Sequence, residues 1–136
     1  MDCRNAPSDG NGSKMKKPNR KAEKKKLDAM WAKIIKLRAK HTCEKCGIKG
    51  VSMNSHHIFA RNSHSTRWDL TNGLCLCCSC HTFGTHAAHR DPSFKDWVVE
   101  YIGEDVYDLL RLNYYTTWDK NIATVREMLE IELAKY

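Results

Sequence analysis

Within residues 43–81, eight side chains have types and spacing that could support two kinds of metal chemistry: four of the cysteines, three of the histidines and one asparagine. In order they are Cys43, Cys46, His56, His57, Asn72, Cys77, Cys80 and His81. Thiolates in Cys-x-x-Cys pairs are typical ligands of structural zinc. Imidazoles can hold a metal or accept a proton near neutral pH. We therefore predict a structural metal site and a second, histidine-rich site with its own chemistry.

The two cysteine pairs predict one Zn²⁺ ion bound by Cys43, Cys46, Cys77 and Cys80. Each tight turn presents two thiolates, and two turns complete the tetrahedron that structural zinc prefers. Thirty residues separate the pairs, so the segment between them must fold as a unit that the ion closes. Cys75 and Cys78 have the same spacing and offer a shifted register. We prefer Cys77 and Cys80 because Cys80 directly precedes His81.

The histidine-rich group has side chains suited to phosphodiester hydrolysis, which needs an activated water, charge neutralisation and help for the leaving oxygen. His56 and His57 would point to opposite faces of a strand, so one can bind a metal while the other meets water or substrate. His81 can complete the metal site, and Asn72 could orient the base through a carbonyl or contact the metal. Any single histidine is more often an ordinary surface or core residue. Their combination with the bracketing zinc ligands favours a catalytic site.

The length and composition indicate one domain with a modest core, 136 residues in all. No apolar run is long enough to cross a membrane, and the N-terminus lacks the apolar stretch of a secretory signal. We therefore expect a cytoplasmic protein that does not enter membranes. In that reducing compartment the seven cysteines favour metal binding over disulfides, which leaves Cys3, Cys75 and Cys78 as free thiols.

Positive charge is concentrated in the first forty residues, which hold 13 Lys and Arg against four acidic residues. Residues 41–136 hold the other ten against 12. A basic arm suits the phosphate backbone of DNA, although a solvated tail would have the same composition. The candidates for phosphate contacts are Lys24, Lys25, Lys26, Arg61 and Arg67. For each arginine the alternative is a solvated or locally paired side chain.

The elements that must position these groups can be predicted from periodicity and turn residues. Residues 1–20 are polar and expected to be disordered. A basic helix is expected over 21–40, with apolar residues at helical spacing that include Trp31 as a core residue. A short strand is expected over 51–60 and a loop over 61–71, and the chain should become helical near Cys78 and carry His81 on its first turns.

The C-terminal third is expected to form three packing helices. Asp91 is a candidate N-cap before Pro92, and Gly103 would end the first of these helices. The next two are expected over 104–112 and 119–135, the last with Ile122, Val125, Leu129 and Leu133 inward. The predicted organisation is thus one domain over 21–136, divided into a basic helix (21–40), a metal-bearing core (41–90) and C-terminal helices (91–136).

At these residues the chain resembles the HNH endonucleases of the ββα-metal (His-Me finger) class, in the zinc-bearing branch. The matching segments are His56-His57-Ile58, Asn72 and Cys77-Cys78-Ser79-Cys80-His81. The stretches 57–61 and 66–69 are further similar to small phage-encoded members such as the NinG (Rap) recombination proteins. The resemblance covers residues 41–112 and implies an α+β fold: a small ββα-metal finger stapled by the four-cysteine zinc site and surrounded by helices.

The resemblance also implies roles. His57 would be the general base, His56 and His81 would bind a single catalytic ion, and Asn72 would orient the base or bind metal. Mg²⁺ or Mn²⁺ is expected, with Zn²⁺ or Ni²⁺ as alternatives. Related members with a His-His start carry a further ligand four residues after the terminal histidine, where this chain has Thr85. His86 follows one residue later, and Gly84 could distort the turn enough for His86 to serve, while His64 and His89 are assigned to the surface.

The function implied by the resemblance is a metal-dependent DNA endonuclease. A phage recombination or replication enzyme that cuts branched or nicked DNA in the host cytoplasm would fit, and a homodimer would suit two-fold branched DNA. The alternative is a zinc-knuckle protein that binds DNA or RNA without catalysis, in which His57 and Asn72 would be incidental. A third interpretation is a zinc-stabilised protein-interaction module.

Overall fold

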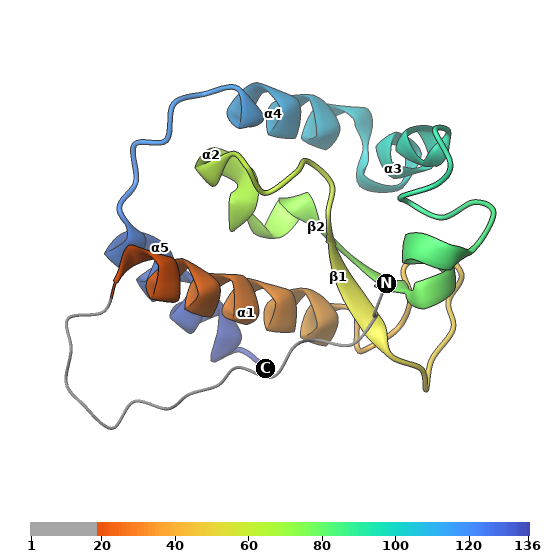
Figure 1. Ribbon diagram of the computed structural model, residues 1–136, viewed down its shortest axis with the longest axis horizontal. Coiled ribbons are helices and arrows are strands. Elements are labelled where there is room, and N and C mark those ends of the chain that lie inside the picture. Colours follow the sequence, from red (N-terminus) through yellow and green to blue (C-terminus); the bar gives the residue numbers. More distant parts are fainter. Residues whose placement is uncertain (1–18) are drawn as a thin grey trace.

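The computed structural model describes residues 19–136, and the predicted disorder of the N-terminal arm falls almost wholly outside them. The fold is mixed α+β and contains one two-stranded antiparallel sheet in the described residues. A long helix precedes the two strands, two short helical segments lie between them, and a π-helix and three helices follow them. Figure 1 shows their arrangement. Their bounds are α1 Arg20–Arg38, β1 Met53–His57, α2 His64–Arg67, η1 Leu70–Asn72, β2 Gly73–Cys77, η2 Ser79–Phe83, α3 Phe94–Ile102, α4 Glu104–Tyr114 and α5 Ile122–Leu133.

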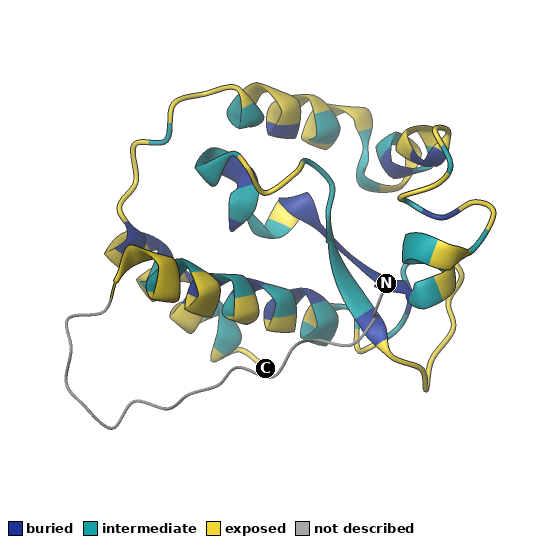
Figure 2. Ribbon diagram, in the orientation of Figure 1, coloured by how far each residue is buried: buried dark blue, intermediate teal, exposed yellow. Residues whose placement is uncertain are grey.

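Helix α1 forms one wall of the molecule. Asn19 caps its first turn by accepting a hydrogen bond from the Ala22 amide at 2.7 Å. Its apolar face is covered, and its outer face is exposed (Figure 2). The buried residues of this helix are Leu27, Trp31, Ile34 and Ile35. This face packs on the hairpin and on α5, so burial of apolar area holds the three elements together.

The hairpin lies between α1 and the α3–α4 pair. Met53 pairs with Cys77 at one end of the ladder and His57 with Gly73 at the other. Every residue of β2 is buried. At Gly73 an added Cβ would lie 2.4 Å from the Ile35 side chain and 2.7 Å from that of Trp31. Gly73 therefore allows α1 to approach the strand that supports His57.

Several boundaries differ from those expected. The first strand spans 53–57 rather than 51–60, and the expected loop over 61–71 contains α2 and η1. Helix α3 starts at Phe94 and its N-cap is Ser93, not Asp91 as expected. The Asp91 carboxylate accepts hydrogen bonds from the amide and hydroxyl of Ser93, and these bonds form a turn that precedes the helix. Helix α5 starts at Ile122 because Asn121 caps it. No helix within residues 19–136 is long and apolar enough to cross a membrane.

Candidate metal and catalytic site

The four predicted cysteines come together and could hold a metal ion. Cys43 and Cys46 lie in the turn after α1, Cys77 ends β2, and Cys80 lies in η2; their sulfur atoms are within 4.8 Å of one another. The Cys46 and Cys77 sulfurs are 3.7 Å apart. Two thiolates bound at about 2.3 Å to a tetrahedral ion would be about 3.8 Å apart. The donor set therefore fits a metal in both chemistry and spacing.

The alternative register is not adopted. The Cys75 side chain is fully buried, and its amide and carbonyl pair with the carboxylate and amide of Glu44. Burial raises the pKa of the Cys75 thiol to about 11, so it stays a neutral core group. Cys75 is free as predicted, but Cys78 is disulfide-bonded, so the prediction of a free thiol there is wrong. Cys3 lies outside the described residues.

Three imidazoles form a second cluster able to hold a metal: His56 from β1, His81 from η2, and His89 from the turn that follows. Their ligand nitrogens all lie within 4.8 Å of one another, and the Nε2 atoms of His81 and His89 are 3.0 Å apart. Two nitrogens bound to one ion at about 2.1 Å and at a right angle would have this separation.

Local electrostatics keep His56 and His81 in the form that binds metal. Burial, followed by the neighbouring imidazoles of His81 and His89, lowers the pKa of His56 to about 3. Burial and then His89 lower the pKa of His81 to about 4. Both rings are therefore neutral at pH 7, with a lone pair available for a cation.

The third member of this cluster is His89 and not the expected His86. The expectation that His89 is an ordinary surface residue is therefore wrong. The His86 side chain is 77% exposed and pairs with the Asp91 carboxylate at 2.9 Å. His89 reaches the cluster because the chain reverses after η2, where the His89 amide donates to the His81 carbonyl and the Ala88 amide to that of Cys80. Helical spacing cannot predict this contact because residues 84–90 are not helical.

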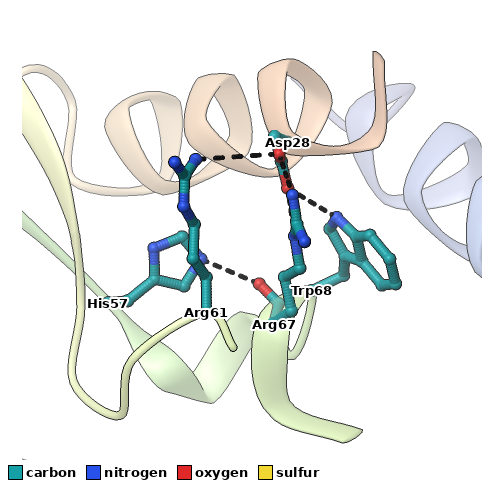
Figure 3. Close-up of polar contacts among 5 residues, drawn as sticks. All are labelled: Asp28, His57, Arg61, Arg67 and Trp68. Carbon is teal, nitrogen blue, oxygen red and sulfur yellow. Dashed lines mark hydrogen bonds and ion pairs between the residues drawn. The ribbon is translucent and has the colours of Figure 1, made fainter. Parts of the chain in front are cut away.

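His57 lies on the other side of β1, as strand alternation predicts for neighbours. Its ring stacks on Trp31, with centroids 3.8 Å apart and an interplanar angle of 9°. Its Nε2 is 2.9 Å from the Arg67 carbonyl oxygen (Figure 3). A carbonyl only accepts, so Nε2 carries the proton in this bond and Nδ1 of the neutral ring keeps its lone pair. Burial lowers the pKa of His57 and so favours this neutral ring.

Asn72 is fully buried and contacts backbone rather than the imidazole cluster. Its Oδ1 accepts from the Phe59 amide at 2.8 Å, and its Nδ2 donates to the Phe59 and Thr66 carbonyls, both at 3.0 Å. It thus joins the two ends of the segment between β1 and α2. The acceptor of His57 is the Arg67 carbonyl, one residue beyond Thr66, so Asn72 supports the backbone that His57 contacts.

Both histidine groups open into one cleft of about 860 Å³. Its walls come from α1, β1, α3 and α4, and its polar lining includes Asp28, His56, His57, Arg61, His81, His89 and Lys95. The Arg61 side chain is 68% exposed at this cleft, whereas that of Arg67 is 17% exposed and pairs with Asp28. Lys25 and Lys26 are exposed on α1, and Lys24 is half-buried. Sequence reasoning missed Asp28 and Lys95, which no local motif distinguishes from other helix charges.

Comparison of the chain with family models, with curated proteins and with solved structures finds no match.

Proposed function

We propose that the protein is a metal-dependent DNA endonuclease that hydrolyses phosphodiester bonds with one catalytic ion. The observation that carries this proposal is that the three-imidazole cluster and His57 line a single open cleft. A metal site alone is common in structural proteins. A metal site next to a neutral histidine whose proton position is fixed by a carbonyl is an arrangement suited to general-base catalysis.

In the proposed reaction, the Nδ1 atom of His57 takes a proton from water as the water oxygen attacks phosphorus. The bond from phosphorus to the 3′ oxygen of the leaving nucleoside breaks, and that oxygen gains a proton from solvent. The ion held by His56, His81 and His89 would neutralise charge on the phosphate and the leaving oxygen. Arg61 and Lys95, which line the same cleft, would contact the phosphate backbone.

The nature of the ligands bears on which ions are bound. Three nitrogen donors favour Zn²⁺ and Ni²⁺, whereas Mg²⁺ and, less strongly, Mn²⁺ prefer oxygen ligands. Four thiolates favour Zn²⁺ in the cysteine site, where its role would be structural. We therefore propose structural zinc and a catalytic transition-metal ion, with Mg²⁺ the weakest of the catalytic ions that the sequence suggested.

Cleavage of supercoiled plasmid tests the base. We expect His57→Ala to lower the nicking rate in the presence of Mn²⁺ or Ni²⁺ by about 10²-fold or more, the range for loss of a general base. Nicking by the variant at the wild-type rate would refute the assignment of His57. The wild type could instead retard DNA in a gel but cut none of the supercoiled, nicked, linear and four-way-junction forms with any of these ions. That result would show that the protein binds nucleic acid without catalysis.

A matched pair of variants tests the metal ligands. We expect the wild type to bind two ions per chain, and His89→Ala to lose the second ion or bind it at least about tenfold more weakly. His86→Ala should bind both ions normally because His86 faces solvent and Asp91. Titration with Co²⁺, whose visible spectrum distinguishes sulfur from nitrogen ligands, separates the two sites. Equal binding by both variants would contradict the proposed ligand set.

The substrate class within DNA is a further part of this proposal. A cleft of about 860 Å³ that includes Arg61 and Lys95 in its lining can accept a backbone phosphate. Branched or nicked DNA is our proposed substrate, and a homodimer for two-fold branches remains a prediction. Comparing cleavage rates on four-way junctions, flaps, nicked circles and linear duplex tests this choice, because equal rates on all four would remove the preference for branched DNA.

A further inference from the structure

The Asp28 carboxylate is the meeting point of three donors from the segment that follows β1. Arg67 contacts it with two nitrogens, Nε at 2.9 Å and Nη2 at 2.6 Å, and the Trp68 indole N–H donates to it at 2.9 Å. Arg61 lies farther away, with its Nη1 3.9 Å from the same carboxylate (Figure 3). Asp28 belongs to α1, thirty-nine residues before Arg67, and lies outside the segment that resembles a nuclease motif.

Arg67 has two contacts that point in different directions. Its side chain binds Asp28, and its backbone carbonyl accepts the proton of His57 Nε2 (Figure 3). A two-point contact between guanidinium and carboxylate fixes orientation as well as distance, which a single hydrogen bond does not. With the side chain of Arg67 fixed on α1, its carbonyl has little freedom to move relative to His57.

The face of the same imidazole also contacts α1. Trp31 stacks on His57 and comes one helical turn after Asp28. One helix therefore restrains the His57 ring in two ways, at its face by direct stacking and at its edge through Arg67. Asn72 donates a hydrogen bond to the Thr66 carbonyl in α2. Asp28 binds the side chain of the next residue, Arg67, from α1.

We propose that Asp28 is a positioning residue that acts through Arg67 to hold the His57 ring with its Nδ1 lone pair free. The proposed catalytic role of this geometry rests on the proposed nuclease function, but the position of the ring proton does not. Arg67 then serves this structure and not DNA, which leaves Arg61 as the arginine available for phosphate.

Helix α1 supplies a matched control for Asp28. Glu23 lies on the same helix, has the same side-chain exposure of 21%, and pairs with an arginine of α5, Arg126, at 3.3 Å. Glu23 does not line the cleft. Loss of this pair therefore reproduces the general effect of removing a half-buried ion pair from α1 without touching Arg67 or His57.

The test measures the His57 ring by ¹⁵N NMR at one pH above 7 in the full-length, Zn²⁺-loaded protein, because Mn²⁺ and Ni²⁺ are paramagnetic and broaden nearby signals. Plasmid nicking by the same variants is measured in parallel with Mn²⁺ or Ni²⁺. In the wild type and in Glu23→Gln we expect His57 as a single Nε2–H tautomer. In Asp28→Asn we expect a mixture of tautomers, with kcat lower by about 10- to 100-fold and KM within about twofold, as for a misplaced catalytic group. Arg67→Lys, which keeps the charge but not the two-point contact, should give an intermediate result and serves if Asp28→Asn does not fold.

An unchanged tautomer in Asp28→Asn and in Arg67→Lys would overturn the positioning role. A mixed tautomer with unchanged kcat would overturn its link to catalysis. If the wild type cuts no DNA, the proposed function fails, and the NMR comparison of Asp28→Asn with Glu23→Gln still decides whether Asp28 positions the ring.

Discussion

At the scale of single residues, the orientations of Asn72 and His57 are fixed by specific hydrogen bonds. Asn72 uses its oxygen and both of its protons on backbone groups, and the Nε2 proton of His57 has one acceptor. Such saturation is what fixes an orientation, because any alternative rotamer leaves a buried polar group unpaired. The same property makes these positions sensitive to substitution.

Replacement of Asn72 should be costly for stability. In Asn72→Ala the Phe59 amide and carbonyl lose their partner at a buried position, and the Thr66 carbonyl loses one donor but keeps the Asp69 amide. We therefore expect a loss of about 2–4 kcal/mol in the free energy of unfolding. Urea denaturation followed by circular dichroism measures this. Asn62→Ala is the control, since exposed Asn62 makes one hydrogen bond with the Tyr114 hydroxyl, and its loss should cost less than about 1 kcal/mol. Equal losses would contradict the bracing role of Asn72.

At the scale of elements, the important feature is the short π-helix η2 and the turn after it. Cys80 belongs to the thiol cluster and His81 to the imidazole cluster, so one turn of helix connects the two candidate metal sites. The chain then reverses at Gly84, whose amide donates to the Ser79 carbonyl at 2.8 Å. This reversal, and not a continued helix, returns His89 to the site.

Gly84 is required for that reversal. A Cβ at this position would lie 2.6 Å from the Ser79 carbonyl oxygen and 2.8 Å from its hydroxyl. We expect Gly84→Ala to displace the turn and weaken metal binding at the histidine cluster by about tenfold, while the cysteine site still binds its ion. Co²⁺ titration again reports each site. Thr85→Ala, at the neighbouring position, should leave both sites intact, and an equal loss in this variant would refute the steric argument.

At the scale of the whole molecule, two helical layers enclose a hairpin too small to be stable alone. Helices α1 and α5 pack on one side, and α3 and α4 on the other (Figure 1). The cysteine cluster connects the end of β2 to the turn that follows α1. With such a small sheet, an ion held by the four cysteines would supply much of the folding free energy.

Loss of a ligand from each candidate metal site should therefore change the melting temperature by different amounts. Cys80→Ser should unfold the chain or lower its melting temperature by tens of degrees, because structural zinc contributes a free energy comparable to the stability of a whole domain. His89→Ala should melt within about 5 °C of the wild type, since its site lies at an open cleft. Differential scanning calorimetry of both variants tests this. A stable, cooperatively folded Cys80→Ser protein would contradict a structural role for the cysteine site.

Some features could be predicted because their cause is local in the sequence. The spacing of the Cys-x-x-Cys pairs predicted the members of the thiol cluster, and the periodicity of α1 predicted its buried face. The alternation of a strand placed His56 and His57 on different sides. The starts of α3 and α5 were less accurate, because the turn at Ser93 and the cap at Asn121 compete with other turn residues nearby.

The four clustered cysteines, His56 and His81 could be identified as candidate metal ligands from the sequence alone, because their spacing and side-chain chemistry are local properties of the chain. The exchange of His86 for His89 and the contact of Asp28 with Arg67 emerge only when the chain is folded. The first depends on a chain reversal whose geometry is set by close contact at Gly84. The second joins residues thirty-nine apart that no periodic pattern relates, and it exists because α1 packs against the hairpin.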